Sequence, residues 1–133
     1  IPLQCEYYAL EGLTGLLETI SRVRQSANPG LVIEGLLRTM YDGRNSLTRE
    51  VSDQLSQHFG DKLFRTVIPR NIRLAEAPSY GKPVIDYDEN CLGTLAHLAL
   101  AGEMVGSAGA SLGTGKAPAD SPDPEAAAQS IDI

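Results

Sequence analysis

The residues best suited to chemistry lie in one stretch, Val67 to Tyr80, which reads VIPRNIRLAEAPSY. Its β-branched run indicates a buried strand, and we expect that strand to end at Ile68 because the following proline cannot donate to a sheet ladder. Ligands bind at the carboxyl ends of strands in open parallel sheets. We therefore predict a functional loop after the strand. Its polar residues are Arg70, Asn71, Arg73 and Glu76.

Phosphate binding is one chemistry that these side chains could carry out, because the planar guanidinium fork of arginine binds phosphate oxygens bidentately. Arg44, in a second predicted loop over residues 41–45, also follows a predicted strand and joins the group. Composition and spacing leave an alternative open. The same residues fit a solvated loop whose surface ion pairs contribute little energy.

Other kinds of site find little support in the sequence. There is no Ser-His-Asp set, no H-E-x-x-H and no cysteine cluster. His58 and His97 fall within predicted helices, where core or partly buried structural roles are expected. Cys5 and Cys91 lack metal-ligand spacing and read as reduced, apolar residues without a disulfide. We therefore assign no catalytic residue and no metal ligand.

A second motif, Gly113-Thr114-Gly115-Lys116, superficially suggests a phosphate-binding loop. It fails the G-x-x-x-x-G-K-[ST] pattern, because the first glycine would fall at Ala110 and the hydroxyl residue at Ala117. Neither a preceding strand nor a following helix is predicted there.

Charge is distributed unevenly along the chain. The net charge is −6, which by itself argues against a nucleic-acid partner, but from Arg38 to Lys82 eight basic residues outnumber five acidic ones. The acidic excess collects after residue 82. Because exposed charges more than about 8 Å apart are screened, the local basic excess matters more for phosphate binding than the total.

Hydrophobic periodicity predicts the elements that position these residues. Strands are expected at residues 1–4, 31–40 and 62–68, and helices at residues 6–25, from Asn45 or Ser46 to Phe59, and at residues 91–104 after an Asn90 cap. In the last helix, Leu92, Leu95, Ala96 and Ala99 are expected to face inward. This alternation predicts an α/β fold, a three-layer parallel sheet with flanking helices joined by right-handed crossovers.

The chain divides into two parts at residue 106. Residues 1–105 form the predicted domain, and residues 106–133 are a Gly/Ala/Pro-rich acidic tail that is expected to be disordered because it cannot bury enough apolar surface. The most apolar window, residues 92–105, is shorter than the roughly 20 residues that span a bilayer. No membrane association and no signal peptide are predicted.

Three segments resemble one family. IPLQCEYYALEGL (Ile1 to Leu13), TMYDGRNSL (Thr39 to Leu47) and VIPRNIRLAEAPSYGKPVIDYD (Val67 to Asp88) are similar in order and spacing to the carboxyl-terminal half of ParA/Soj chromosome-partitioning ATPases. These are P-loop NTPases of the deviant Walker A class. The resemblance covers about residues 1–105 and implies a P-loop NTPase-like fold of which only the C-terminal half is present.

The resemblance also implies a function. ParA/Soj proteins bind ATP and Mg²⁺, form a homodimer around two nucleotides, bind DNA without sequence preference and hydrolyse ATP when a ParB-type protein stimulates them. It places Arg44 and Arg73 at DNA and Pro69, Arg70 and Asn71 near the nucleotide base. It further implies a cytoplasmic, nucleoid-associated protein that segregates chromosomal or plasmid DNA.

This sequence departs from the family pattern in having no Walker A lysine loop and no Walker B aspartate, both of which we expect upstream of Ile1. Those groups hold the phosphates and Mg²⁺. The chain alone is therefore expected neither to hydrolyse ATP nor to bind it tightly.

Three alternatives differ in function. A truncated product could act only as a DNA-binding or partner-binding module. A MinD-like cell-division ATPase would end in an amphipathic membrane-binding helix, for which the tail offers no pattern. A Rossmann-type enzyme would carry a G-x-G-x-x-G segment, and this sequence has none.

Overall fold

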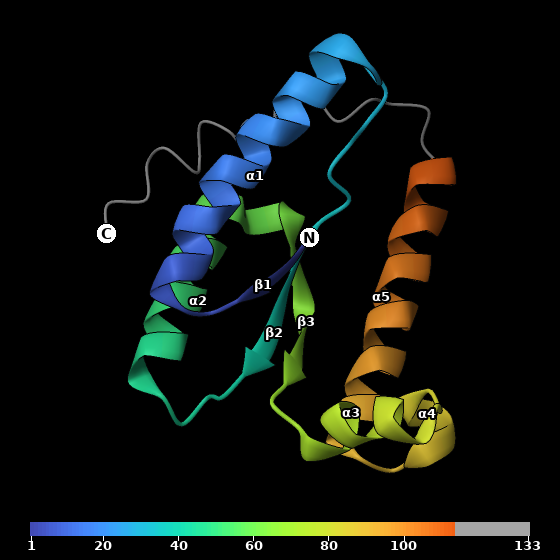
Figure 1. Cartoon of the computed structure of the whole chain (residues 1–133). Coiled ribbons are helices and arrows are strands. Elements are labelled where there is room, and N and C mark those ends of the chain that lie inside the picture. Colours follow the sequence, from blue (N-terminus) through green and yellow to red (C-terminus); the bar gives the residue numbers. More distant parts are fainter. Residues whose placement is uncertain (114–133) are drawn as a thin grey trace.

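The computed structural model of the chain describes residues 1–113. Three parallel strands form one sheet in the order β1-β2-β3, and helices cover both of its faces (Figure 1). The strands and α-helices, in chain order, are β1 (Pro2–Gln4), α1 (Tyr7–Ser26), β2 (Leu36–Tyr41), α2 (Ser46–Phe59), β3 (Leu63–Pro69), α3 (Ile72–Glu76), α4 (Val84–Tyr87) and α5 (Leu92–Gly113). Two short 3-10 turns are η1 (Gly60–Lys62) and η2 (Ala77–Tyr80).

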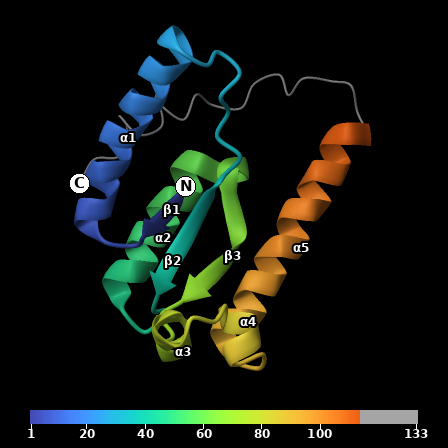
Figure 2. The ribbon, with the colours of Figure 1, turned by 45° about the vertical axis from the view of Figure 1, so that its right-hand side comes forward.

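The layers follow from the strand order. Right-handed crossovers between successive neighbouring strands place their helices on the same side, so α1 and α2 share one face of the sheet. Helix α5 follows β3 and packs on the opposite face (Figure 2). The predicted fold class, a parallel sheet with helices on both faces, is confirmed.

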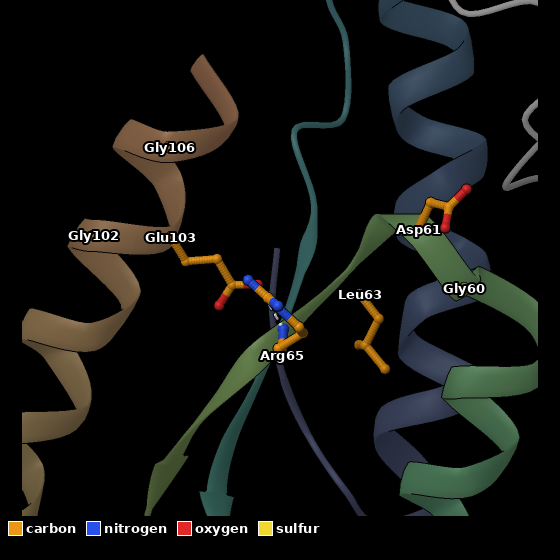
Figure 3. Close-up of a pocket in the computed structure, with 7 residues that line it drawn as sticks. All are labelled: Gly60, Asp61, Leu63, Arg65, Gly102, Glu103 and Gly106. Carbon is orange, nitrogen blue, oxygen red and sulfur yellow. Dashed lines mark hydrogen bonds and ion pairs between the residues drawn. The ribbon is translucent and has the colours of Figure 1, made fainter. Parts of the chain in front are cut away.

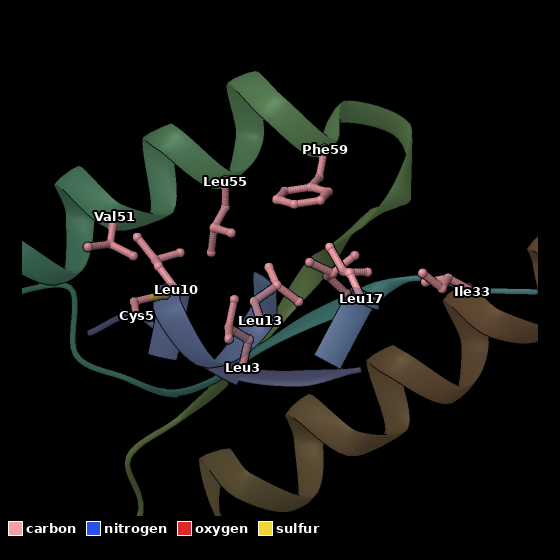
Figure 4. Close-up of a cluster of buried hydrophobic side chains, with 10 residues drawn as sticks. Leu3, Cys5, Leu10, Leu13, Leu17, Ile33, Val51, Leu55 and Phe59 are labelled. Atoms are coloured by element: carbon pink, nitrogen blue, oxygen red, sulfur yellow. The ribbon is translucent and has the colours of Figure 1, made fainter. Parts of the chain in front are cut away.

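The hydrophobic core lies between the sheet and its first two helices (Figure 4). Buried side chains recur at helical spacing along α1 and α2, as the apolar stripes of both helices predicted. Asn45 caps α2, because its side chain accepts a hydrogen bond from Leu47 N at 3.0 Å. The helical part of the core consists of Leu10, Leu13, Leu17, Val51, Leu55 and Phe59.

Two charged side chains hold an irregularity in β3. The register with β2 shifts between Leu36 and Arg38, so the strand is bulged there. On one side, Arg38 Nη2 donates to the carbonyl oxygens of Phe64 and Arg65 at 2.9 and 3.2 Å. On the other, the carboxylate of Glu103 in α5 accepts from Arg65 N and Thr66 N at 2.8 and 3.0 Å. The bulge therefore exposes consecutive backbone groups that both charges satisfy.

The second strand is shorter than the apolar run predicted. Strand β2 begins at Leu36, because β1 pairs from Pro2 and β3 from Leu63, which leaves residues 31–35 without a strand alongside. The third strand extends one residue past the predicted end, through Pro69. Arg70 N, not the proline, donates to Tyr41 O at 3.1 Å, so the missing proline donor costs the ladder nothing.

The expected loop after β3 is partly helical. Residues 72–76 form α3, which Asn71 caps by accepting from Arg73 N at 2.8 Å. A further short helix, α4, replaces the apolar stop and solvated run predicted there. The side-chain cap at Asn71 is a local interaction that favours a helix here and that composition alone did not predict.

Helix α5 differs from its prediction in cap, face and length. Cys91, not Asn90, occupies the cap position, and its Sγ accepts from Thr94 N at 3.4 Å. Leu92, Leu95 and Ala99 are exposed, whereas Thr94 is buried and bonded to Asp88 O at 2.7 Å. The helix is apolar on all sides, so periodicity could not choose its inner face.

The predicted tail begins too early, because α5 continues to Gly113 and residues 106–113 are helical. The alanines and glycines of residues 106–113 extend a helix that is already nucleated. Their composition alone predicted disorder. The remainder of the predicted tail, residues 114–133, lies outside the described residues. So does most of the rejected GTGK motif.

Each histidine lies within hydrogen-bond distance of a backbone carbonyl of its own helix. His58 is half-buried, with Nδ1 2.8 Å from Gln54 O, as a partly buried structural role predicted. His97 is exposed rather than in the core, and its Nδ1 lies 2.8 Å from Gly93 O. Both cysteines are free, and burial raises the pKa of the Cys5 thiol.

Removing Glu103 should loosen the bulge of β3. Burial would raise the pKa of Glu103, but the hydrogen bonds from Arg65 and Thr66 outweigh it, so the pKa lies below its usual value. We expect Glu103→Ala to expose both amides at a local cost of about 1–3 kcal/mol, and Glu103→Gln to cost less. Hydrogen exchange at Arg65 and Thr66 measures this. Unchanged protection of both amides in Glu103→Ala would contradict it.

Candidate functional site

The carboxyl edge of the sheet brings two loops together. Strands β2 and β3 end side by side, with Tyr41 opposite Pro69 and Arg70 N bonded to Tyr41 O at 3.1 Å. The segment after each strand therefore starts from adjacent points. Two of the arginines singled out from the sequence, Arg44 and Arg70, lie in these segments.

Arg44 is locked to a carboxylate of its own loop. Its Nε and Nη2 lie 2.9 and 2.8 Å from Oδ1 and Oδ2 of Asp42, and Arg44 N donates to Oδ1 at 3.1 Å. The Arg44 side chain is nonetheless 91% exposed. A bidentate pair of this kind fixes the plane of the guanidinium while leaving its outer edge in solvent.

This geometry controls the protonation of Asp42. Hydrogen bonds from the Arg44 side chain and backbone lower the pKa of Asp42 to about 2, and the charge of Arg70 lowers it further. The same pairing raises the pKa of Arg44. Guanidinium groups of both loops thus act on the Asp42 carboxylate, Arg44 by direct hydrogen bonds and Arg70 by its charge.

The segment Pro69-Arg70-Asn71 lies directly beyond β3. Arg70 is exposed, while Pro69 and Asn71 are half-buried. The side-chain oxygen of Asn71 is occupied by the cap of α3. Its amide nitrogen remains a hydrogen-bond donor, which suits recognition of acceptor atoms on a ligand.

Arg73 belongs to a different cluster. Its Nη1 lies 3.0 Å from Glu76 Oε2, and its Nε lies 3.3 Å from Asp88 Oδ2. Tyr87 donates to the same Glu76 oxygen at 3.1 Å and stacks near Tyr80, with ring centroids 5.0 Å apart. Burial and the Glu76 carboxylate raise the pKa of Tyr87. Arg73 therefore faces α3 and the segment after α4, not the Asp42 loop.

Sequence reasoning singled out Glu76 but missed the other partners of the arginines, Asp42, Tyr87 and Asp88. Asp42 could have been found, because an aspartate two residues before an arginine at a turn can bond both its backbone amide and its side chain. Tyr87 and Asp88 carry no such signal. They reach Arg73 only through the path of the chain across η2 and α4.

A cleft of about 520 Å³ lies at the opposite end of β3, between the strand and α5. Figure 3 shows Arg65 and Glu103 pointing toward one another there, with Nε and Oε1 3.7 Å apart. Gly102 and Gly106 form its helical wall. The cleft is thus remote from the arginines of the carboxyl edge.

Residues 1–113, the part of the chain that the structure describes, show neither a metal-binding cluster nor a membrane-spanning helix. Within residues 1–113, no cluster of three or more His, Cys, Asp or Glu side chains has the arrangement to hold a metal ion. Over the same residues, no helix combines the length and hydropathy needed to cross a bilayer.

The pKa of Asp42 should respond to Arg44. Because the folded pKa is lowered, the ion pair is present above the usual carboxyl range and is lost as pH falls through about 2. In Arg44→Ala the midpoint should rise toward 3.8. Carbon NMR of the Asp42 carboxyl group during a pH titration measures it, with Arg22→Ala as the matched control. An equal midpoint in both variants would contradict the pairing.

Comparison with known proteins places the chain in a family. A family model described as the CobQ/CobB/MinD/ParA nucleotide binding domain matches residues 5–84. An uncharacterized protein of Pseudomonas putida is 64% identical over 105 residues, which make up 79% of this chain and 40% of the relative. The chain spans about that share of the other curated relatives as well.

Several relatives carry functional names. The chromosome partitioning protein ParA of Caulobacter vibrioides is 57% identical over 79% of this chain and 39% of its own length. The chromosome-partitioning ATPase Soj of Treponema pallidum is 53% identical over 79% of this chain and 42% of its own length. The resemblance to ParA/Soj proteins is thereby confirmed. Since the family model matches more than half of its residues, this chain belongs to the CobQ/CobB/MinD/ParA nucleotide-binding domain family.

Proposed function

We propose that the chain is part of a ParA-type ATPase that segregates chromosomal or plasmid DNA. In this proposal the whole protein binds ATP and Mg²⁺, dimerises around the nucleotides, binds DNA without sequence preference and hydrolyses ATP under stimulation by a ParB-type protein. It acts in the cytoplasm on the nucleoid. The observation that carries the proposal is the exposed arginine pair, Arg44 and Arg70, at the carboxyl edge of a sheet of this family.

The DNA-binding role rests on Arg44 and Arg73. Arg44 exposes nearly all of its side chain and Arg73 about half, 48%. Guanidinium groups at a surface bind phosphate oxygens, and phosphate contacts carry no sequence information. Nonspecific binding that weakens with salt is the behaviour that this chemistry supports.

The nucleotide role rests on Pro69, Arg70 and Asn71. They lie at the carboxyl ends of parallel strands, where open α/β sheets bind ligands. Pro69 supplies an apolar surface against which a base ring can pack, and the amide nitrogen of Asn71 can donate to it. The phosphates and Mg²⁺ would be held by groups outside these 133 residues, since the sequence has no Walker A or Walker B motif.

A module without catalysis is the second candidate, favoured by one observation. The arginines proposed for DNA, Arg44 and Arg73, are present and exposed within these residues. A chain of this composition could bind DNA or a partner without hydrolysing ATP. The related MinD-like reading has no such observation in its favour.

The DNA role predicts a specific change in salt dependence. In the full-length protein, Arg44→Ala and Arg73→Ala should each weaken binding across all DNA sequences and flatten the slope of log affinity against log salt by about one unit. Filter binding at several salt concentrations measures both. Arg22→Ala removes the same charge from an exposed position of α1 and should leave the slope unchanged. Wild-type slopes in both test variants would remove the DNA role.

The nucleotide role predicts that the 133-residue chain by itself is inactive. Without the phosphate-holding loop and the Mg²⁺ carboxylate, phosphoryl transfer lacks its positioning groups. We expect no magnesium-dependent ATP hydrolysis by the purified chain and clear hydrolysis by the full-length protein with its ParB-type partner. A rate in the purified chain that is lost on adding a chelator would overturn this expectation and favour a complete site within these residues.

A further inference from the structure

Both arginines proposed for DNA already bind carboxylates of their own chain. We propose that Asp42, Glu76 and Asp88 restrain Arg44 and Arg73, so that a DNA phosphate competes with internal carboxylates for each guanidinium. This inference rests on the proposed DNA role and concerns its regulation. It makes these carboxylates the residues that limit DNA affinity.

The contact at Arg44 is built for such competition. Asp42 occupies the Nε/Nη2 side of the guanidinium with two oxygens at 2.9 and 2.8 Å, which is the same bidentate geometry that a phosphate would use. A further hydrogen bond, from Arg44 N to Oδ1 at 3.1 Å, keeps the carboxylate beside the guanidinium. A tethered competitor two residues away acts at high effective concentration.

Arg73 is restrained in the same way by a separate set of residues. Glu76 takes Nη1 and Asp88 lies against Nε, so both sides of the fork face carboxylates. Tyr87 donates to Glu76 Oε2 and holds that carboxylate in place. The arrangement recurs at the second proposed DNA contact, on different elements, which makes an isolated surface pair an insufficient description.

The charges around Arg44 and Arg73 also support the proposed restraint. Arg44 and Arg73 face three carboxylates between them, so, apart from the charge of Arg70, the paired groups offer DNA little net positive charge until the pairs open. A phosphate that arrives at Arg44 meets the negative charge of Asp42 as well as the guanidinium. Replacing a restraining carboxylate by its amide removes this repulsion and frees the fork. In Asp42→Asn, the amide oxygen still accepts from Arg44 N, so the turn is retained.

A bound carboxylate can also act in the opposite way, by orienting a guanidinium toward a ligand. The two roles predict changes of opposite sign. Restraint predicts tighter DNA binding when the carboxylate is neutralised, whereas orientation predicts weaker binding. The occupied bidentate side of Arg44 and the two carboxylates around Arg73 favour restraint.

The experiment measures binding of a short random-sequence DNA duplex to the full-length protein with ATP and Mg²⁺, by fluorescence anisotropy at several salt concentrations. Asp42→Asn should tighten binding by about two- to fivefold at low salt, the range expected for releasing a surface ion pair. Glu76→Gln, which keeps an oxygen for Tyr87, should act in the same direction. Glu50→Gln is the matched control, because it neutralises an exposed carboxylate on α2.

A double mutant separates local restraint from a general change in charge. In an Arg44→Ala background, Asp42→Asn should lose its advantage and behave like Glu50→Gln, since there is no guanidinium left to free. Equal effects of Asp42→Asn and Glu50→Gln in the wild-type background, or weaker binding in Asp42→Asn, would overturn the inference. If Arg44→Ala alone leaves binding unchanged, the proposed DNA role fails first, and the restraint fails with it.

Discussion

The parallel pairing of β2 with β3 is the interaction on which the candidate site depends. It places Tyr41 opposite Pro69, and the bond from Arg70 N to Tyr41 O closes the ladder where the strands end. The loops that carry Arg44 and Arg70 therefore leave the sheet from adjacent points, and one carboxylate, Asp42, senses both guanidinium groups. Without that register, the two loops would not start from adjacent positions.

That pairing is irregular, and two ionic side chains make the irregularity tolerable. A bulge turns consecutive backbone groups of β3 away from the ladder, and buried backbone groups without partners are costly. Arg38 supplies donors from the α2 side, where its Nη1 also bonds Ser52 Oγ at 2.9 Å, and Glu103 supplies acceptors from α5. The position of α5 and the path of β3 are thus tied through one carboxylate.

The sequence predicted what depends on local pattern or on strand order. Amphipathic stripes located α1 and α2, Asn45 was a possible cap, and alternation of element types predicted the parallel sheet. It could not predict features set by a partner distant in the chain. Residues 31–35 are apolar but have no neighbouring strand, and the inner face of α5 is chosen by contacts such as Leu74 against Gly93. The candidate arginines were found, yet Tyr87 and Asp88 were not, because only folding brings them to Arg73.

Net charge is a poor guide to what these arginines can bind, in either direction. The total charge of −6 argues against DNA binding, and the basic excess between Arg38 and Lys82 argues for it. Neither count takes into account which charges are paired with one another. Screening limits exposed charges to a range of about 8 Å, so a phosphate near Arg44 responds mainly to Asp42 and Arg70. In the proposed restraint, DNA affinity depends on how readily a phosphate replaces the carboxylates at each guanidinium. In that proposal, the acidic residues nearest the arginines matter more to binding than the acidic composition of the whole chain.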